Sequence, residues 1–522
     1  MGGRPVRQRF LAFDIGTQSA RAIIFNDAGE LLAKAQVPIE PYSSPQPGWA
    51  EQAPEIYWQA LIQAGAELWR QSAVPPSTIS ALALTTLRST VVCCDQAGMP
   101  LRPAIVWLDQ RRASQPPRLP ARLRWLLRLV GATDLVADFQ AQAEANWLAQ
   151  HEPRLWAQCT RYVLLSGWLT HRLTGEWVDS SGCQVGYLPF DYRRQRWLAP
   201  GDWRWKTLAA RAQQLPRLVA PGTPLGTLRA DVAAALGLPS GLPVIAAAAD
   251  KACEALGCGL AGADEAALSF GTTATINTVQ RRYLEVQRWL PAYPAAQPDA
   301  WNAEIQIYRG FWMVSWFKRE FAQRERDLAR ERSVAVESLF DDLLRSAPPG
   351  AQGLVLQPYW SPGVREPDPA AKGAVIGFGD VHTRAHLYRA IIEGLAYGLR
   401  AGRETLEHRL RRRIRRVVAA GGGSRSDAVM QIAADVFGQP VERPRYYESA
   451  ALGAAINAAV GVGRYVDHSA AVRAMCAPGM SFTPQPEAAA RYDALYRQVY
   501  REIYPRLQPL YARIRRITGY PA

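Results

Sequence analysis

The sequence lacks any apolar run of 18 or more residues. A helix that crosses a bilayer needs such a run, so we expect no membrane span and no membrane partner. The N-terminal stretch MGGRPVRQRF leads straight into a strand-like segment rather than into the apolar core of a signal peptide. We therefore also expect no secretory leader.

Cysteine is scarce, and its seven positions show neither metal-ligand spacing nor a disulfide framework. This usage fits a reduced, cytoplasmic protein. The cysteines are Cys93, Cys94, Cys159, Cys183, Cys253, Cys258 and Cys476.

Several sequence signatures of nucleotide and metal sites are missing. There is no G-x-x-x-x-G-K-[ST] motif and no protein-kinase signature, which excludes those two enzyme classes. GCGLAG at 257–262 matches the dinucleotide fingerprint by letter, but residues 250–256 predict a helix where that motif needs a strand. His382 and His386 stand four apart at a predicted helix start, yet no third ligand follows nearby, so a metal site there is not favoured.

Acidic residues are outnumbered, 46 against 61 basic ones, which gives a formal charge of +15. Nucleic-acid binding is one interpretation. The other is a solvated basic surface that also favours anionic ligands such as ATP. The densest run, residues 408–416, ends a predicted helix, where cations are favourable. We favour the basic surface and expect no nucleic-acid partner.

The chain is long enough for two domains, and two halves open in the same way. Residues 11–25 read LAFDIGTQSARAIIF and residues 267–281 read ALSFGTTATINTVQR. Each predicts a strand, a Gly-Thr turn and a second strand, so that backbone N–H groups and hydroxyls surround one point, as a phosphate site requires. Either turn alone is compatible with an ordinary hairpin. The pairing favours a phosphate site, and Asp14 adds a carboxylate suited to hydrated Mg²⁺.

The rest of the chain alternates strand and helix patterns, which predicts α/β domains. We expect strands at 79–84 and 90–95 and an amphipathic helix at 54–69. The second half predicts helices at 385–406, 426–437 and 450–460, and a last amphipathic helix at 486–505. Gly/Pro-rich segments at 41–48 and 347–353 predict exposed loops.

Two further segments are candidates for chemistry. Asp250 follows the apolar run at 244–249, which predicts a buried strand, and it opens a helix. It is either a rigidly held catalytic acid or a plain N-cap. The run at 419–424 carries three glycines, which allow a flat ring to approach the backbone, with Ser424 as the expected cap of the following helix.

Together these segments make the chain resemble the FGGY carbohydrate kinases, a family that includes glycerol, xylulose, ribulose and gluconate kinases. The resemblance runs from about residue 9 to about residue 465. It rests on FDIGTQSARA at 13–22, GWAEQAPEIYW at 48–58, LRPAIVWLDQR at 101–111, LTGEWVDSS at 173–181, AADKACEALGCG at 248–259, SFGTT at 269–273, KGAVIGF at 372–378, HTRAHLYRAIIEGLAYGLR at 382–400, GGGSRSDAVMQIAADVFGQPV at 421–441 and ESAALGAA at 448–455.

This resemblance implies two ribonuclease-H-like, actin-like ATPase domains with a cleft between them, at 1–262 for the substrate and first phosphate loop and at 263–522 for the nucleotide. It implies ATP and Mg²⁺, a small sugar or polyol as substrate, and makes a homodimer plausible. Asp250 is then the general base, and Asp14 helps to place Mg²⁺. The phosphate loops are Gly16, Thr17, Ser19 and Arg21, and Gly271, Thr272 and Thr273; Gly310, Gly422, Gly423 and Asp427 lie near the nucleoside; Arg88, Trp107, Asp109, Asp250 and Lys251 face the substrate.

The substrate signature departs from the named subfamilies. Xylulose kinases usually carry Gln-Met-His-Gly after the strand that ends here at Leu84, and glycerol kinases carry Gln-Arg-Glu. Here Arg88 matches the glycerol-type arginine, but Ser89 replaces its glutamate, and Glu144 stands where a lysine often lies three residues before a tryptophan. A ketopentose kinase such as xylulose kinase therefore stays an alternative. So do a non-catalytic sugar- or nucleic-acid-binding member and an ATPase of the actin or chaperone type.

Overall fold

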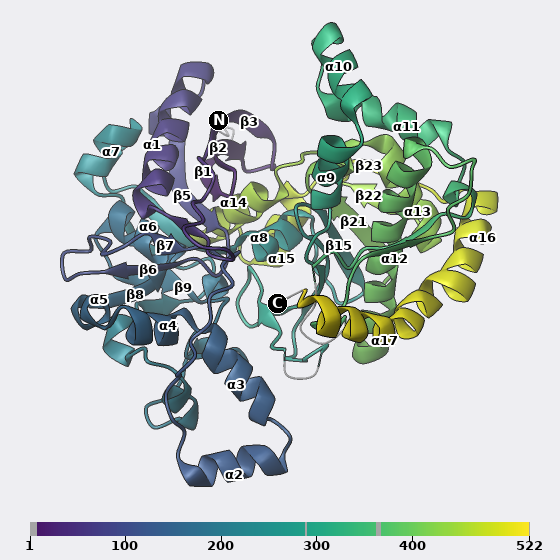
Figure 1. Cartoon of the computed structure of the whole chain (residues 1–522). Coiled ribbons are helices and arrows are strands. Elements are labelled where there is room, and N and C mark those ends of the chain that lie inside the picture. The colour runs from purple at the N-terminus through teal and green to yellow at the C-terminus, as the bar shows by residue number, and fades with distance from the viewer. Residues whose placement is uncertain (1–7, 288–289, 362–366, 521–522) are drawn as a thin grey trace. The chain divides into compact units, whose positions relative to one another are not determined.

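The computed structural model describes residues 8–287, 290–361 and 367–520. Residues 1–7, most of the stretch on which the expectation about a leader rests, lie outside them. The chain divides into two compact units, and Figure 1 shows the course of each. Unit 1 comprises residues 1–261, 280–302 and 449–476, and unit 2 comprises residues 262–279, 303–448 and 477–522. No described helix combines the length and the apolarity that crossing a membrane requires.

Unit 1 is an α/β unit. Its helices are α1 (Pro54–Gln71), α2 (Ala121–Leu129), α3 (Thr133–Gln142), α4 (Glu144–His151), α5 (Pro153–Gln158), α6 (Leu165–Thr174), α7 (Ala230–Leu236), α8 (Asp250–Gly257), α14 (Ser449–Gly461) and α15 (His468–Met475). Its strands are β1 (Arg9–Ile15), β2 (Ser19–Asn26), β3 (Leu31–Pro38), β4 (Glu51–Gln52), β5 (Ile79–Thr86), β6 (Val91–Cys94), β7 (Ala104–Ile105), β8 (Arg161–Leu164), β9 (Val178–Ser180), β10 (Phe190–Asp191), β11 (Arg196–Trp197), β12 (Arg217–Val219), β13 (Pro224–Thr227), β14 (Pro243–Ala249) and β17 (Tyr293–Pro294).

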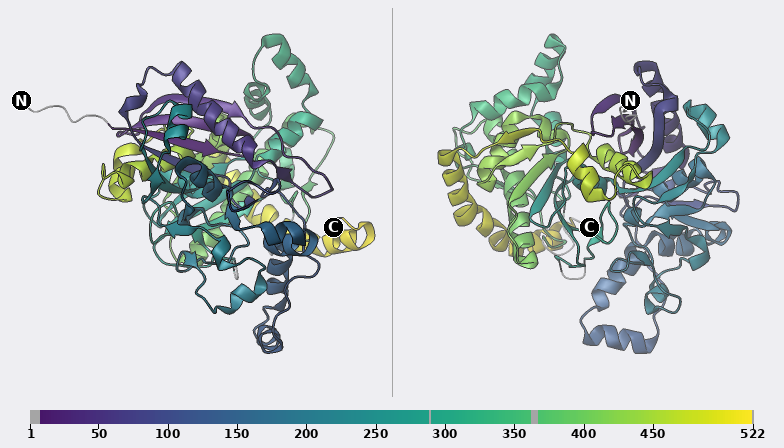
Figure 2. Two further views of the ribbon diagram at one scale, coloured as in Figure 1. Left: turned by 90° about the vertical axis from the view of Figure 1, so that its left-hand side faces the viewer. Right: turned by 180° about the vertical axis from the view of Figure 1, so that it is seen from behind.

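The main sheet of unit 1 has the order β13-β14-β5-β1-β2-β3 and is covered on both faces. Side chains of β1 alternate between the two layers, as a strand requires. Leu11, Phe13 and Ile15 belong to the apolar cluster that includes α1, while Phe10 and Ala12 belong to the cluster that includes α14. Coverage on both faces explains why β1 is a nearly continuous apolar run. Figure 2 gives two further views of these layers.

Unit 2 is also an α/β unit. Its helices are α9 (Trp312–Glu320), α10 (Gln323–Arg332), α11 (Phe340–Ser346), α12 (Arg384–Leu410), α13 (Asp427–Phe437), α16 (Pro486–Leu495) and α17 (Arg501–Thr518). Its strands are β15 (Glu265–Phe270), β16 (Ala274–Gln280), β19 (Val355–Gln357), β20 (Ala374–Ile376), β21 (Arg416–Ala420), β22 (Val441–Arg443) and β23 (Met480–Phe482), together with most of β18 (Trp301–Ile307).

The two main sheets repeat the same topology. In unit 2 the order β18-β16-β15-β21-β22-β23 follows the order β3-β2-β1-β5-β14-β13 of unit 1, strand for strand. In each sheet the first hairpin is antiparallel, the next two pairings are parallel and the last is antiparallel. The repeat of the Gly-Thr hairpins in the sequence therefore reflects a repeat of the whole sheet.

Most predicted elements are confirmed. The strands at 79–84 and 90–95 are β5 and β6, and the helix at 54–69 is α1. The helices of the second half are α12, α13 and α14. The segment 41–48 is exposed throughout, as expected of a loop. The helix predicted at 250–256 is α8, so GCGLAG follows a helix and does not have the strand that a dinucleotide-binding motif requires before it.

Two predicted segments are wrong in part. The last helix does not end at Pro505: after a π-turn at Tyr496–Tyr500 it continues as α17 with Pro505 and Pro509 inside it. Burial of aromatic side chains along this stretch outweighs the amide that each proline removes. The segment 347–353 is not a fully exposed loop, because Gly350 is buried and its N–H donates to Glu393 Oε1 at 3.0 Å.

Neither unit is one continuous segment of the chain. Residues 280–302 and 449–476 pack with unit 1, although they follow the expected division at residue 262. In unit 1, α14 lies against β1, β5 and α8. The functional division between a substrate half and a nucleotide half stays a prediction.

Candidate active site

The turn between β1 and β2 gathers the residues predicted for the first phosphate loop. Ile15 pairs with Ala20 across the hairpin, and the N–H of Gly16 donates to Ser19 O at 3.0 Å. Asp14, the last but one residue of β1, is buried, and its Oδ2 accepts from Arg21 Nη1 at 2.8 Å. Thr17 Oγ1 accepts a hydrogen bond from the indole of Trp107 at 3.1 Å, so a predicted phosphate residue contacts a predicted substrate residue.

Asp250 stands at an irregular strand end that is held by side chains. The pairing of β14 with β5 shifts register between Ala246 and Ala249, which takes the intervening carbonyls out of the ladder. Ser180 Oγ donates to Ala247 O at 2.5 Å, and Thr85 Oγ1 donates to Ala248 O at 2.8 Å. These bonds satisfy buried carbonyls and fix the backbone immediately before Asp250.

The Asp250 carboxylate is oriented but accessible. It is the first residue of α8 rather than its N-cap, which is Ala249. Its Oδ1 accepts from the N–H of Lys251 at 2.7 Å, and the side chain is 31% exposed. A carboxylate fixed on one oxygen by a backbone amide and open to solvent is suited to accept a proton from a bound hydroxyl.

Cationic and aromatic groups surround this carboxylate. Arg88 Nε lies 3.9 Å from Asp250 Oδ1, and its guanidinium carbon lies 5.5 Å from the ring centroid of Tyr293. Lys251 Nζ pairs with Glu254 Oε2 at 2.9 Å. Burial lowers the pKa of Lys251, but the carboxylates of Glu254 and Asp250 outweigh it and leave that pKa raised. The raised pKa keeps Lys251 a cation at neutral pH, beside the guanidinium of Arg88.

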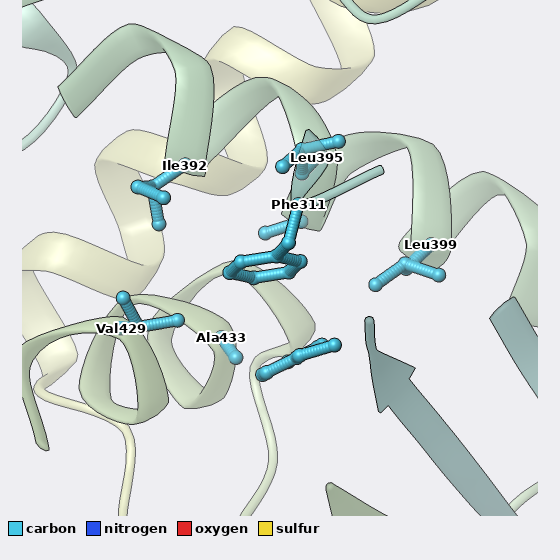
Figure 3. A pocket seen from close by; sticks show the side chains of 8 residues that line it. Phe311, Ile392, Leu395, Leu399, Val429 and Ala433 are labelled. Atoms are coloured by element: carbon cyan, nitrogen blue, oxygen red, sulfur yellow. The ribbon is translucent and has the colours of Figure 1, made fainter. Parts of the chain in front are cut away.

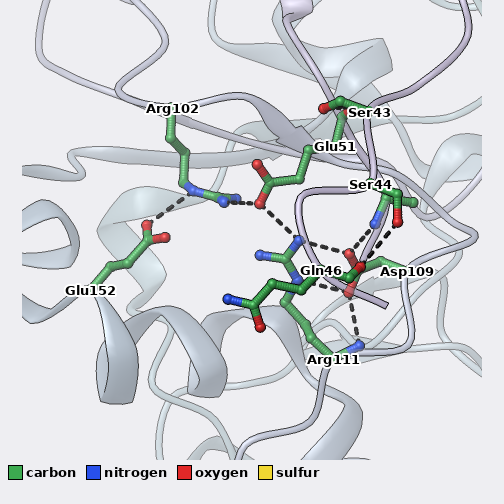
Figure 4. A network of polar contacts seen from close by, with 9 residues as sticks. Ser43, Ser44, Gln46, Glu51, Arg102, Asp109, Arg111 and Glu152 are labelled. Atoms are coloured by element: carbon green, nitrogen blue, oxygen red, sulfur yellow. Dashed lines mark hydrogen bonds and ion pairs between the residues drawn. The ribbon is translucent and has the colours of Figure 1, made fainter. Parts of the chain in front are cut away.

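Asp109 lies inside a buried network, drawn in Figure 4. Arg111 binds it in a bidentate way, Nε to Oδ1 at 2.7 Å and Nη2 to Oδ2 at 2.7 Å, and the N–H of Ala50 donates to Oδ2 at 2.6 Å. Arg111 also pairs with Glu51 at 2.8 Å, and its guanidinium carbon lies 4.1 Å from the ring centroid of Trp49. Asp109 thus joins the 48–52 and 107–111 segments.

Glu144, which opens α4, lies near this network. Burial is the main cause that raises the pKa of its carboxyl to about 7, the neighbouring Asp109 raises it further, and Arg111 opposes both. A carboxyl with such a pKa carries a proton for part of the time at neutral pH. It is the position at which the resemblance leads one to expect lysine.

In unit 2 the predicted second phosphate loop and Gly310 pack together. The turn Gly271–Thr273 joins β15 to β16, and Phe270 of β15 pairs with Ala274 of β16 on either side of it. The N–H of Phe311 donates to Gly271 O at 3.0 Å. A Cβ on Gly310 would lie 2.1 Å from the backbone nitrogen of Ala274, so no larger residue fits there without a backbone shift.

The glycines after β21 lie around the same point. Gly421 has φ of +87°, and a Cβ there would lie 2.9 Å from the carbonyl carbon of Phe270. A Cβ on Gly423 would meet the ring of Phe311 at 2.4 Å, while one on Gly422 would meet nothing within 4 Å. Of the three glycines, Gly422 alone therefore faces open space in unit 2.

The cap of α13 differs from the expectation. Ser424 does not cap this helix, because its hydroxyl donates to Gly421 O at 2.8 Å inside a short 3-10 turn. Ser426 is the N-cap, and its hydroxyl accepts from the N–H of Val429 at 3.1 Å. Asp427, the first residue of α13, binds Arg443 Nη1 at 2.7 Å, and its side chain is largely exposed.

A small apolar cavity lies behind these loops, and Figure 3 shows its side chains. Phe270 and Phe311 stack with ring centroids 4.8 Å apart and line it together with α12 and α13. Its lining residues are Phe270, Phe311, Ile392, Leu395, Ala396, Leu399, Val429 and Ala433. No polar side chain lines it, so it is unsuited to phosphate.

The structure brings most of the predicted residues together in three local clusters, two in unit 1 and one in unit 2. In unit 1, Arg88, Asp250 and Lys251 form one group, and Asp14, Thr17, Arg21 and Trp107 form another; in unit 2, Gly271, Gly310, Gly421 and Gly423 surround Phe270 and Phe311. Sequence reasoning missed Tyr293, because it is remote from Arg88 in the chain. It also missed Glu254, although the i,i+3 spacing from Lys251 on a helix carried a signal.

Among the described residues, no three His, Cys, Asp or Glu side chains gather as a metal site. His386 Nδ1 instead accepts from the N–H of Thr383 at 3.1 Å, which caps α12. Within the β1–β2 hairpin, Arg9–Asn26, Asp14 is the carboxylate next to the Gly-Thr turn. One protein carboxylate suits Mg²⁺, which keeps water and substrate phosphate oxygens as its other ligands.

The two units thus share a duplicated sheet, each sheet opens with a Gly-Thr hairpin, and unit 1 presents an accessible aspartate at the end of a strand. Models of the FGGY family of carbohydrate kinases match the chain, the N-terminal domain over residues 9–257 and the C-terminal domain over residues 266–462. The chain belongs to the FGGY family of carbohydrate kinases, and its two-domain, ribonuclease-H-like fold is confirmed. It is an ATP-dependent carbohydrate kinase.

Relatives are similar along nearly the whole chain. The protein named Uncharacterized sugar kinase YgcE of Escherichia coli is 29% identical, over 94% of this chain and 92% of that protein. A xylulose kinase of Bacillus subtilis is 27% identical, over 93% and 95%. The solved xylulose kinase of Rhodospirillum rubrum superposes with a TM-score of 0.78 at 28% identity, covering 97% of this chain and all of that one. A gluconate kinase of Lactobacillus acidophilus, at 21% identity and a TM-score of 0.81, supports the fold alone.

Proposed function

We propose that the protein transfers the γ-phosphate of ATP in line to a hydroxyl of a small sugar or polyol, with Asp250 as the general base. The observation that carries the proposal is the Asp250 carboxylate, fixed by the N–H of Lys251 and exposed beside Arg88. As the substrate oxygen attacks phosphorus, its proton passes to this carboxylate. The cation of Arg88 then steadies the substrate oxygens and the charge that develops on them.

The remaining proposed roles are those that the family implies for the matching residues of this chain. The proposed phosphate loop of unit 1 comprises Gly16, Thr17, Ser19 and Arg21. The proposed phosphate loop of unit 2 comprises Gly271, Thr272 and Thr273. Gly310, Gly422, Gly423 and Asp427 receive the nucleoside. Asp14 holds Mg²⁺, which neutralises phosphate charge when it is bound. Arg21 Nη1 pairs with Asp14 Oδ2 at 2.8 Å and orients that carboxylate.

The proposed substrate is a sugar or polyol whose hydroxyls meet Arg88, Trp107, Asp109, Asp250 and Lys251. Several relatives are named xylulose kinase and others gluconokinase, so a ketopentose and a sugar acid are the first candidates. Xylulose stays the specific alternative. The two cations beside Asp250, Arg88 and Lys251, favour oxygen-rich substrates without choosing between these classes.

The first experiment measures ADP release with Mg·ATP against ketoses, aldoses, polyols and sugar acids. One compound should stimulate release, and Asp250→Asn should lower kcat by roughly 10²–10⁴-fold, the usual worth of general-base catalysis. Asp231→Asn removes an exposed carboxylate from unit 1 and should leave kcat unchanged.

Other outcomes separate the alternatives. ATP hydrolysis that no sugar changes would indicate an ATPase of the actin or chaperone type. Sugar binding without ADP release would indicate a non-catalytic member. An Asp250→Asn enzyme with near-normal kcat would contradict the assignment of the base.

A further inference from the structure

The helix α2 exposes an unusual amount of apolar surface. Trp125 is 64% exposed, Leu129 63%, Leu126 52% and Val130 49%. At 100° per residue, Trp125, Leu129 and Leu126 lie within one third of the helix circumference, so they form a stripe. Leu127, on the opposite side, is buried and attaches the helix to unit 1. Figures 1 and 2 show α2 at the tip of the projection that it forms with α3.

Four arginines accompany this stripe. Arg118 precedes the helix, Arg122 lies within the arc of the stripe, Arg128 borders it, and Arg124 lies further round the helix on the same side as Arg128. Within the described part of the chain none of their guanidinium groups forms an ion pair, a hydrogen bond or a ring contact. Residues 110–133 contain neither Asp nor Glu. The stripe therefore combines apolar side chains with one arginine inside its arc and further arginines on one side of it, and the structure shows no internal partner for their charge in the described residues.

This combination distinguishes between occupants. A second copy of the same helix would bring eight uncompensated arginines together, which like charges oppose. Nucleic acid would satisfy the arginines but would leave the exposed tryptophan and leucines without a function. An anionic lipid surface satisfies both, because the apolar stripe enters the acyl boundary while arginine stems extend towards the headgroups.

We propose that α2 is a membrane-surface anchor that holds this kinase reversibly on bilayers rich in anionic lipid. The anchor consists of residues 118–130. One short helix binds weakly and depends on salt, as expected of interfacial rather than membrane-spanning attachment. The proposal does not depend on which sugar the kinase takes.

The test is flotation of the full chain with vesicles of phosphatidylglycerol and phosphatidylcholine in equal parts, compared with phosphatidylcholine alone. The wild type should float with the anionic vesicles, at low salt more than at high salt, and not with the neutral ones. Two variants address the two components: Arg122→Gln/Arg124→Gln/Arg128→Gln removes charge, and Trp125→Ala/Leu129→Ala removes the stripe. The charge variant should lose partitioning roughly 100-fold, because each arginine near an anionic surface contributes about fivefold.

A matched control removes the same charge elsewhere. Arg409→Gln/Arg412→Gln/Arg413→Gln alters exposed arginines of unit 2 and should keep most of the binding. Both α2 variants should retain the kinase activity of the wild type in solution, which shows that they fold.

Three results would overturn the proposal. One is equal loss of flotation in the control and in the charge variant, which would mean diffuse attraction by net charge. Another is flotation that is insensitive to Trp125→Ala/Leu129→Ala. The third is absence of flotation with the wild type. A doubled mass in light scattering would then indicate that a second copy covers the stripe, and a DNA mobility shift would indicate nucleic acid; without either, the proposal is still contradicted.

Discussion

The Asp250 side chain depends on residues that the sequence places far from it. Asp250 could be predicted as a candidate catalytic residue, because an apolar run followed by Asp and a helix pattern indicates the end of a buried strand. The contacts that fix the backbone before Asp250 could not be predicted. The hydroxyls of Thr85 and Ser180 bind the two preceding carbonyls at a register shift that no local sequence pattern encodes. Arg88 and Tyr293 likewise meet only through the fold. Sequence motifs thus identify reacting groups more readily than the groups that orient them.

Glu144 gives a pH-dependent prediction at the same scale. Burial raises its pKa to about 7 in the folded protein, above the ordinary value of 4.5, so the folded state binds the proton more tightly. Below the ordinary value both states are protonated and stability is unaffected. Between the ordinary value and about 7 the unfolded state loses its proton while the folded state still holds it, so the free energy of unfolding falls as pH rises towards 7 and stays lower above it.

Glu144→Gln should therefore stabilise the protein at pH 8 by about 1–3 kcal/mol and by much less at pH 5. Denaturant unfolding at both pH values measures this. Glu40→Gln, at an exposed position, is the control and should give no such pH-dependent difference. Equal effects of Glu144→Gln at pH 5 and pH 8 would contradict the raised pKa.

At the scale of elements, the three glycines after β21 have different surroundings. The sequence predicts the whole run as a segment that a flat ring approaches, but the structure divides it into packed and open positions. Gly421 and Gly423 are small because Phe270 and Phe311 pack on them. Since those contacts come from β15 and from the residues before α9, the sequence alone could not separate structural from ligand-facing glycines.

Two substitutions separate these roles. Gly310→Ala forces a Cβ to 2.1 Å from the Ala274 nitrogen, so it should lower stability by about 1–3 kcal/mol, as overpacking does. Gly422→Ala meets nothing within 4 Å and should leave Tm unchanged while raising the KM for ATP several-fold. Thermal unfolding and ATP kinetics measure both. An unchanged KM in Gly422→Ala would remove Gly422 from the nucleoside site.

At the scale of the whole molecule, the chain builds the same sheet twice and then returns to the first. The repeat was visible in the sequence because both hairpins keep a Gly-Thr turn. The return of residues 449–476 to unit 1 was not, because nothing in the composition of an alanine-rich helix indicates which sheet it will cover. That helix, α14, buries Ala451 and Ala455 beside Phe10 and Ala12 of β1.

The closest approach of α14 to α8 is made by two glycines. A Cβ on Gly257 would lie 1.9 Å from Ser449 O, and a Cβ on Gly453 would lie 2.0 Å from Cys253 O. The two backbones are therefore in direct contact, which accounts for both the GCG segment and the ALGAA segment without a ligand. Because α8 begins with Asp250, a helix late in the chain sets the position of the proposed base.

Gly453→Ala should consequently displace α8 and lower kcat by roughly 10- to 100-fold, as small misplacements of reacting groups do. Gly453→Ser, with a larger side chain, should lower it further. Equilibrium binding of adenosine, which lacks the phosphates, provides the control, because the proposed nucleoside residues lie in unit 2, and its Kd should stay that of the wild type. A Kd that weakens in parallel with kcat would mean general loss of the fold. An unchanged kcat in both variants would show that α14 does not position Asp250.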